Sequence, residues 1–144
     1  IGISEGGVYF AHHLAQSIGC DMDILLTEPI KAPNNDEVAI AMVSETQEVV
    51  MNKALIDSFE ISEDFVYTTA QDRYDDEVVS YVYRYRKGEP LISLQDKDVI
   101  LVEECVESGL TMMVSLKSVI ERGAQNVYIA TPILDKSVYD NLQA

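Results

Sequence analysis

The stretch that decides the fold is VILVEECVESGLTM, residues 99–112. It overlaps the mostly apolar run Asp98–Val102, which is typical of a strand buried on both faces of a parallel sheet. Two carboxylates, Glu103 and Glu104, follow this run, and apolar residues at helical spacing begin after Thr111. The stretch therefore predicts a buried strand, a polar loop and a helix, in that order.

The same alternation of strands and helices extends along the rest of the chain. Strands that alternate with helices predict an α/β fold with a mostly parallel sheet. A hairpin or flap is predicted where two β-prone runs flank a polar turn. The predicted elements are a stub at Ile1–Ile3, a helix from Val8 that Gly19 closes, a strand at 24–26 that ends at Pro29, β-prone runs at 38–43 and 49–51, a long polar helix at 62–87, a strand at 126–129 and a terminal helix from Ser137.

Length, composition and charge limit the kind of protein. With 144 residues, 47% hydrophobic and 24% charged, the chain predicts a single globular domain. A net charge of −15 argues against nucleic acid and anionic membranes as partners. No apolar run approaches the roughly 20 residues of a membrane span. Two cysteines without a CxxC pair and the lack of a signal peptide predict a cytoplasmic protein, and Ile1 in place of Met suggests a missing N-terminal segment.

Two predicted strand-to-helix loops, Ser4–Gly7 and Glu103–Thr111, are candidates for ligand binding. In open α/β sheets, ligands bind where strands lead into helices. Both loops contain glycine, so backbone N–H groups can approach an anion closely. In the second loop, Ser108–Thr111 suits a phosphate, and the carboxylates of Glu103 and Glu104 suit sugar hydroxyls or a divalent metal.

These loops resemble those of a known family. Residues 99–112 resemble the phosphoribosyl-pyrophosphate signature of type I phosphoribosyltransferases, in which a hydrophobic strand precedes two acidic residues and Thr-Gly-x-Thr. Gly2–Val8 resembles the family's pyrophosphate loop, and Lys31–Ile40 resembles the flap of one bacterial branch. The resemblance implies one Rossmann-like, three-layer α/β/α domain over residues 1–144, with a mostly parallel sheet and a flap at 30–51.

The resemblance also implies an activity and a set of site residues. The expected function is Mg²⁺-dependent binding of phosphoribosyl pyrophosphate, or another sugar phosphate, and transfer of its 5-phosphoribosyl group to an acceptor such as a nucleobase. A homodimer is a further expectation, and no direct metal ligand is assigned. The implied site consists of the catalytic pair Glu103 and Glu104, a phosphoribosyl loop of Cys105, Val106, Glu107, Ser108, Gly109, Leu110 and Thr111, a pyrophosphate loop of Ser4, Glu5, Gly6 and Gly7, and Lys31 on the flap.

Departures from the family pattern leave a second function open. Glutamates stand in place of the usual aspartate pair, and Ser108 replaces threonine. Glu5 occupies a position where this branch usually has arginine, and Glu107 puts a negative charge into the phosphate loop. The alternative is a catalytically degenerate member that binds a nucleotide or sugar phosphate as a regulatory or structural protein.

Other patterns that could suggest chemistry have simpler interpretations. Gly2-x-Ser4-x-Gly6 matches a hydrolase nucleophile elbow, but both histidines, His12 and His13, follow the serine directly and none lies downstream. Cys105 lies between carboxylates that disfavour its thiolate form, which argues against a nucleophile. The charged residues of the 62–87 helix predict a solvated face, and its aromatics predict packing or dimer contacts.

Overall fold

Two boundaries, after Leu25 and after Pro90, divide the chain into two compact units in the computed structural model, which describes residues 1–142. The first unit contains Ile1–Leu25 and the chain from Leu91 onward. The second unit contains Leu26–Pro90. Each unit has its own cluster of buried apolar side chains, so each is described by itself.

The first unit is built on parallel strands. Strand β4 (Asp98–Val102) pairs in parallel with β6 (Asn126–Ala130), with Val102 opposite Ala130. Gly2 forms parallel bridges to both Ile24 and Val102, so the first residues of the chain lie between β4 and the segment around Ile24. A short parallel pair, β5 (Cys105–Val106) with β7 (Ile133–Leu134), follows the end of β4. The predicted α/β fold with parallel strands is confirmed.

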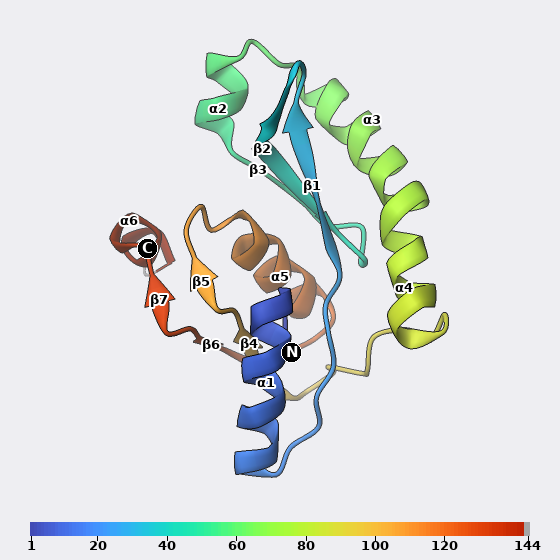
Figure 1. Ribbon diagram of the computed structural model, residues 1–144, viewed down its shortest axis with the longest axis vertical. Helices are drawn as coiled ribbons and strands as arrows, with labels where there is room; N and C mark the ends of the chain where they lie inside the picture. The colour runs from blue at the N-terminus through green and yellow to red at the C-terminus, as the bar shows by residue number, and fades with distance from the viewer. Residues whose placement is uncertain (143–144) are drawn as a thin grey trace. The chain divides into compact units, whose positions relative to one another are not determined.

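Helices cover both faces of these strands, α1 (Glu5–Ile18) on one and α5 (Leu110–Glu121) on the other (Figure 1). Alternate residues of a strand point to opposite faces. Val99 and Leu101 join the core cluster that includes Met112 of α5, whereas Ile100 and Val102 face α1. A last helix, α6 (Lys136–Leu142), follows β7. Three layers result, as the family resemblance implies.

The second unit is an antiparallel sheet with helices packed on it. Its strands lie in the order β1-β2-β3, and β2 is the central strand. The hairpin between the runs at 38–43 and 49–51 forms where the sequence predicts it. The elements are β1 (Thr27–Ala32), β2 (Asn35–Ser44), β3 (Val49–Met51), α2 (Lys53–Ser58), α3 (Glu63–Arg73), η1 (Tyr74–Val78) and α4 (Val79–Arg86).

The predicted strand at 24–26 that ends at Pro29 is wrong. Ile24 lies outside the strands of residues 1–142 and forms an isolated bridge to Gly2, and β1 runs through Pro29, which lies opposite Met42. Proline has no backbone N–H to donate, so strands tolerate it at the edge of a sheet, where one side has no partner strand. Because β1 is the edge strand of its sheet, Pro29 does not end it.

The long helix predicted at 62–87 contains a wide π turn. Helix α3 continues through the π-helical segment η1 into α4, and the N–H of Val79 donates to the carbonyl of Tyr74, five residues back. Val66, Ala70, Tyr74 and Val78 pack against one core cluster at a spacing of four residues. An α-helix turns every 3.6 residues, so the wider turn keeps Val78 on the buried face.

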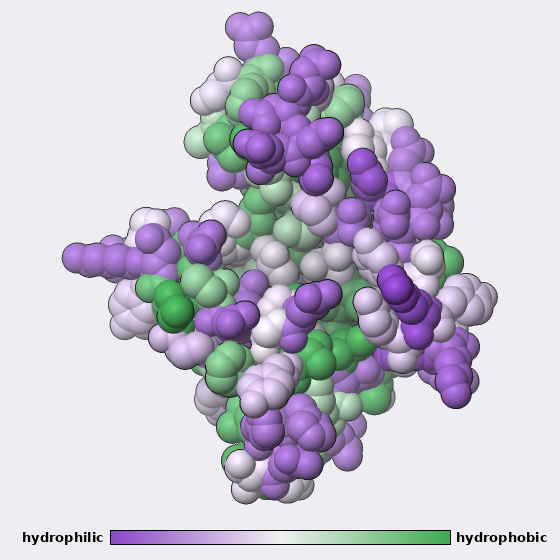
Figure 2. Space-filling model, viewed as in Figure 1, coloured by the Kyte–Doolittle hydropathy of each residue, from purple (hydrophilic) through white to green (hydrophobic). Residues whose placement is uncertain are grey.

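The charged residues of this helix lie on its outer side. Asp72, Asp75 and Asp76 are exposed, and hydrophilic side chains, purple in Figure 2, gather over α3 and α4. The aromatics divide between two environments. Tyr74 packs against the core and Tyr81 donates a hydrogen bond to Glu28, whereas Phe65 and Tyr85 are exposed.

A buried ion pair joins the end of α4 to the turn after β2. Arg86 pairs with Oε2 of Glu45, and the two side chains are only 9% and 6% exposed. The other carboxylate oxygen of Glu45 accepts the N–H of Leu26 at 2.9 Å. Removing one partner of a buried ion pair strongly destabilises the folded state.

We therefore expect Glu45→Ala to lower the free energy of unfolding by about 3–5 kcal/mol, because it removes one partner of a buried ion pair and the carboxylate oxygen that accepts the N–H of Leu26. Urea unfolding followed by circular dichroism measures this change. Glu37→Ala, at an exposed position of β2, is the matched control and should change stability by less than about 0.5 kcal/mol. Equal effects of the two substitutions would contradict a stabilising role for the pair.

Candidate functional site

The two predicted ligand loops meet at the end of β4. Glycines at the start of α1 approach the backbone there so closely that a side chain would not fit. A Cβ atom at Gly7 would collide with the carbonyl oxygen of Val102 and lie 3.1 Å from Cα of Glu103. A Cβ at Gly6 would lie 2.7 Å from Cβ of Glu104. The Gly-Gly pair thus lets the first loop lie directly against the two acidic residues.

Local hydrogen bonds start both helices. Ser4 caps α1 by accepting the N–H of Gly7 at 3.0 Å, so the helix begins at Glu5 and not at the predicted Val8. In the second loop, Ser108 accepts the N–H of Leu110 at 3.4 Å, and Gly109 has a left-handed backbone with φ of 76°. Leu110 is accordingly the first residue of α5, one residue before the predicted start.

The loop between β4 and α5 lines an open hollow of about 280 Å³. We call it the acidic hollow because two carboxylates line it. It lies at the carboxyl end of β4 and the N-terminal end of α5, which is where open α/β sheets bind ligands. Its lining residues are Glu103, Cys105, Val106, Glu107, Ser108, Gly109 and Thr111.

Glu103 is the unusual residue of the acidic hollow. Its side chain is only 9% exposed, and within residues 1–142 its buried Oε2 atom has no hydrogen-bond partner. Burial disfavours the charged form and raises the pKa of this carboxyl to about 7. A buried polar atom without a partner costs free energy, so this oxygen is suited to a ligand that supplies a hydroxyl or a cation.

Cys105 is not an activated nucleophile. Its Sγ lies 4.0 Å from Oε1 of Glu107. Desolvation and the carboxylates of Glu107, Glu103 and Glu104 raise the pKa of the thiol. The less reactive thiol form is therefore favoured, as the sequence predicts.

Not all predicted site residues line this hollow. Glu104 is exposed and packs against Gly6, and Leu110 is buried in the core. Glu5 is exposed in the first turn of α1. Lys31 lies in β1 of the second unit with an exposed side chain, and its role in a flap stays a prediction.

One supporting residue escaped prediction. Thr131, after β6, donates its hydroxyl to the carbonyl of Ile133 at 2.8 Å, and the same hydroxyl oxygen lies 3.5 Å from the carbonyl oxygen of Glu104. It is 27 residues away in the chain, and only the parallel pairing of β4 with β6 brings it to the loop. No local pattern in the sequence could have indicated this contact.

The residues of the acidic hollow fit a divalent cation only together with a ligand. Among residues 1–142, no group of three or more His, Cys, Asp and Glu side chains could hold a metal ion. Glu103 and Glu107 nevertheless offer two carboxylates, and the Oε2 atom of Glu103 has no other partner in that range. Mg²⁺ is commonly held by one or two carboxylates together with water and substrate phosphates. These two carboxylates could therefore hold Mg²⁺ if the phosphate of a ligand supplied further oxygen atoms.

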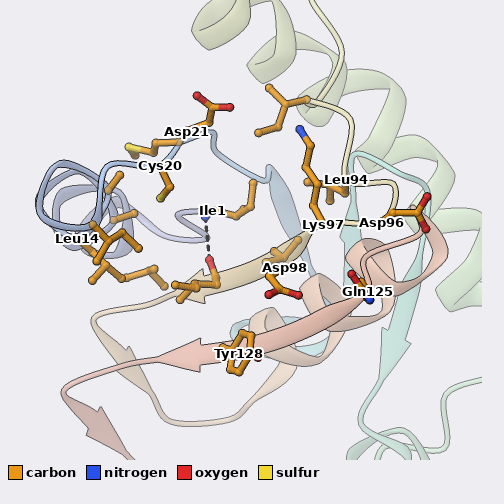
Figure 3. A pocket seen from close by; sticks show the side chains of 18 residues that line it. Ile1, Leu14, Cys20, Asp21, Leu94, Asp96, Lys97, Asp98, Gln125 and Tyr128 are labelled. Carbon is orange, nitrogen blue, oxygen red and sulfur yellow. Dashed lines mark hydrogen bonds between the residues drawn. The ribbon is translucent and has the colours of Figure 1, made fainter.

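A larger hollow, of about 780 Å³, lies between α1 and the strands (Figure 3). Apolar side chains such as Leu14 and Ile100 line it, and its polar residues include Asp96, Lys97 and Asp98 at the start of β4. These polar groups lie at the amino end of the strand, whereas α/β sheets bind ligands at the carboxyl ends. The acidic hollow is therefore the candidate site, although it is the smaller one.

Known proteins share sequence and fold with this chain. The sequence model of the family described as phosphoribosyl transferase domain matches residues 1–143. Two proteins of Mycobacterium tuberculosis, from strains CDC 1551 and H37Rv, bear the name "putative phosphoribosyl transferase" and are 25% identical over 137 residues, which is 92% of this chain and 30% of each relative. The crystal structure of a Thermus thermophilus protein, TT1426, matches with a TM-score of 0.73 and 27% identity over 96% of this chain and 65% of that one.

The chain thus spans less than a third of the length of these curated relatives and 65% of the solved structure. Within residues 1–142, none of the helices has the length and apolar character needed to cross a bilayer.

We expect Gly7→Ala to destabilise the first unit by roughly 1–3 kcal/mol, because the added methyl group forces α1 away from the carbonyl of Val102. Thermal and urea unfolding measure the loss. Gly19→Ala is the control: its backbone is left-handed, but no atom lies within 4 Å of the new methyl group, so only about 1 kcal/mol of backbone strain is expected. A loss at Gly7 no larger than at Gly19 would show that the close approach is unimportant.

Glu103 should make stability depend on pH. The pKa of this carboxyl in the folded chain, about 7, lies above its ordinary value of 4.5. Its contribution to the free energy of unfolding is therefore fully present below about pH 4.5, where the carboxyl is neutral, and is lost as the pH rises through 7, because the buried carboxyl must then ionise. Glu103→Gln removes this loss and should be more stable than the parent at pH 8 by on the order of 2 kcal/mol, with little difference near pH 4. Urea unfolding of the variant and the parent between about pH 4 and pH 8 measures this difference. If the free energies of unfolding of the two proteins changed with pH in the same way, the burial of the Glu103 carboxyl would be contradicted.

Proposed function

The chain belongs to the phosphoribosyl transferase domain family, and from this premise we propose that it binds 5-phosphoribosyl 1-pyrophosphate and transfers the phosphoribosyl group to an acceptor. The observation that carries the proposal is the buried carboxylate oxygen of Glu103, which has no hydrogen-bond partner among residues 1–142, on a residue that lines a hollow at the N-terminal end of α5. A sugar phosphate supplies both a hydroxyl for this oxygen and an anion for the helix end.

The 5-phosphate is assigned to the Ser108–Thr111 turn. The first turn of α5 presents backbone N–H groups, and the helix dipole favours a negative charge there. The hydroxyls of Ser108 and Thr111 line the same hollow and can donate to phosphate oxygens. Gly109 lets the backbone turn sharply into the helix, because its left-handed conformation would strain any other residue.

The pyrophosphate is assigned to the start of α1. The N–H of Gly7 already donates to Ser4, so the N–H of Gly6 is the contact that we assign to pyrophosphate. Gly6 lies against Glu104, and Glu104 follows Glu103 directly. The two ends of one substrate, its ribose and its pyrophosphate, would thus lie on adjacent segments of the first unit.

In the transfer itself, the bond between C1 of the ribose and the pyrophosphate oxygen breaks, and its electron pair leaves with the pyrophosphate. A lone pair of the acceptor forms the new bond to C1, and the acceptor loses a proton to solvent. Glu103 and Glu104 would stabilise the positive charge that develops on the ribose. Mg²⁺, when bound with the substrate, would neutralise charge on the leaving group. Catalysis of this kind is mostly positioning and electrostatics.

One observation favours a second candidate, a binding protein without turnover. Glu107 lines the hollow in which the phosphate should lie, and its carboxylate repels an anion there. Such a protein would hold a nucleotide or sugar phosphate as a regulator. Turnover with an acceptor separates it from the enzyme.

Calorimetric titration of 5-phosphoribosyl 1-pyrophosphate in the presence of Mg²⁺ is the first test, followed by pyrophosphate release with a panel of nucleobases. We expect binding, and a loss of transfer on the order of 100-fold in the double variant Glu103→Gln/Glu104→Gln, because the charge on the ribose loses its stabilisation. Glu121→Gln, at an exposed position near the end of α5, is the control and should keep full activity.

Two results would contradict the proposal. Absence of binding at millimolar ligand with Mg²⁺ would exclude the substrate, and unchanged transfer in the double variant would exclude the assigned roles. Binding without pyrophosphate release from any acceptor would favour the regulatory alternative.

A further inference from the structure

The long helix of the second unit carries a line of charged side chains on its outer side. Helices α3, η1 and α4 follow one another from Glu63 to Arg86, a length of roughly 36 Å at 1.5 Å per residue (Figure 1). Two positions along a helix amount to a rotation of about 200°, so they lead from its buried side to its outer side. We call the outer line the charged stripe. It consists of Asp72, Asp76 and Ser80, which lie two positions after Ala70, Tyr74 and Val78 of the core side, and of Arg84 and Lys87 at the end of α4.

The two halves of the charged stripe carry opposite charges, and all five of its residues are exposed. Asp72 and Asp76 are four positions apart, and Arg84 and Lys87 are three positions apart. Like charges at these spacings lie next to each other on a helix and destabilise it. Within residues 1–142, none of these four side chains forms an ion pair. Each half therefore lacks the countercharge that would stabilise it.

The order of these charges makes the stripe complementary to itself. In an antiparallel pair of identical helices with a two-fold axis at Ser80, residues equally far before and after position 80 lie opposite each other. Asp76 of one copy then lies opposite Arg84 of the other, because each is four positions from Ser80. Asp72 lies within one position of the residue opposite Lys87. Each contact occurs twice, because a two-fold interface uses the same surface of both copies.

The centre of the stripe suits close packing of two helices. Ser80 has a small side chain, so two helix axes can approach there to the distance of about 8–10 Å that is usual for packed helices. The charged groups then lie on both sides of the contact point. Their repeat every four residues continues across the wide turn at Tyr74–Val78, which keeps Asp76 and Ser80 on the outer side.

Exposed aromatic rings add contact area to the basic half. The side chains of Tyr83 and Tyr85 are 67% and 54% exposed. The ring of Tyr83 lies against Gly88, where a Cβ atom would come within 2.9 Å of it, and the guanidinium of Arg84 lies 5.7 Å from the ring centre of Tyr85. Tyrosine and arginine are enriched in protein interfaces. The basic half therefore combines charge with apolar surface.

The net charge of the chain limits which surface two copies can share. At −15, two copies repel each other, and most exposed surfaces would bring carboxylates together. The charged stripe has two acidic and two basic residues, so its formal charge is zero. A partner must offer cations to its first half and carboxylates to its second. A second copy, reversed in direction, offers both at the same spacing.

We propose that the charged stripe binds the same stripe of a second copy of this chain, in an antiparallel homodimer in which Asp76 of each copy pairs with Arg84 of the other. The proposal does not rest on the proposed function, because the stripe belongs to the second unit and none of its residues lines the acidic hollow. Exposed ion pairs are weak singly, so the dimer is reversible and its affinity depends on the network of pairs.

Sedimentation equilibrium of the whole chain at low salt should show a reversible dimer. Asp76→Arg should raise the dimer dissociation constant at least about tenfold, because it turns two attractive contacts into repulsive ones. The substitution also makes the acidic chain less negative, so relief of the general repulsion alone would lower the dissociation constant. Glu37→Arg makes the same charge change at an exposed position of β2 and is the matched control, which should not raise it.

A charge swap tests the assigned pair directly. Arg84→Glu should weaken the dimer as Asp76→Arg does. An equimolar mixture of these two variants should form mixed dimers with about the parent affinity, because every altered residue then faces the opposite charge. The double variant Asp76→Arg/Arg84→Glu keeps the net charge of the parent and should self-associate like it. Asp72→Arg and Lys87→Glu repeat the swap at the other contact, and circular dichroism verifies that each variant keeps its helices.

Four results would overturn the proposal. The first is a parent chain that stays monomeric at millimolar concentration. The second is a dimer that neither Asp76→Arg nor Arg84→Glu weakens. The third is a weakened dimer that neither the mixture nor the double variant restores. The fourth is an equal loss in Glu37→Arg, which would trace the effect to general charge. None of these measurements depends on sugar-phosphate binding or transfer, so the proposed function stands or falls separately.

Discussion

The backbone of Gly7 lies so close to the end of β4 that no side chain fits between them, and the candidate site depends on this approach. Parallel bridges from Gly2 to Ile24 and Val102 hold the first residues of the chain among the strands. The chain then enters α1 directly beside Glu103 and Glu104. Two loops about 100 residues apart in the sequence thus become one surface, because their strands are neighbours in the parallel sheet.

The acidic hollow shows how one site can depart from the rules that shape the rest of the fold. In the core cluster of the first unit, buried residues are apolar and pack against one another. Glu103, at the end of β4, is a buried carboxylate with an oxygen that no described residue satisfies. Such an unsatisfied group calls for an explanation, and a catalytic role or a bound ion is among those that apply. The same residue is therefore a cost to stability and the strongest indication of function.

Some structural features were beyond the reach of sequence patterns. Pro29 would end a central strand but lies in an edge strand, and strand order is not encoded locally. The π turn at Tyr74–Val78 arises because the long helix keeps a four-residue spacing of buried side chains against the second core. The short strands β5 and β7 have two residues each, too few for a recognisable period.

The sequence by itself determined the α/β fold, the buried strand at 98–102, the hairpin after Ser44 and the two glycine-containing loops, because each follows from local periodicity or turn chemistry. It also identified the residues that line the acidic hollow, since they are contiguous in the chain. Only the tertiary structure decided that Glu103 is buried while Glu104 is exposed, and that Thr131 reaches the loop. Burial depends on which segments pack over a residue, and those segments come from distant parts of the chain.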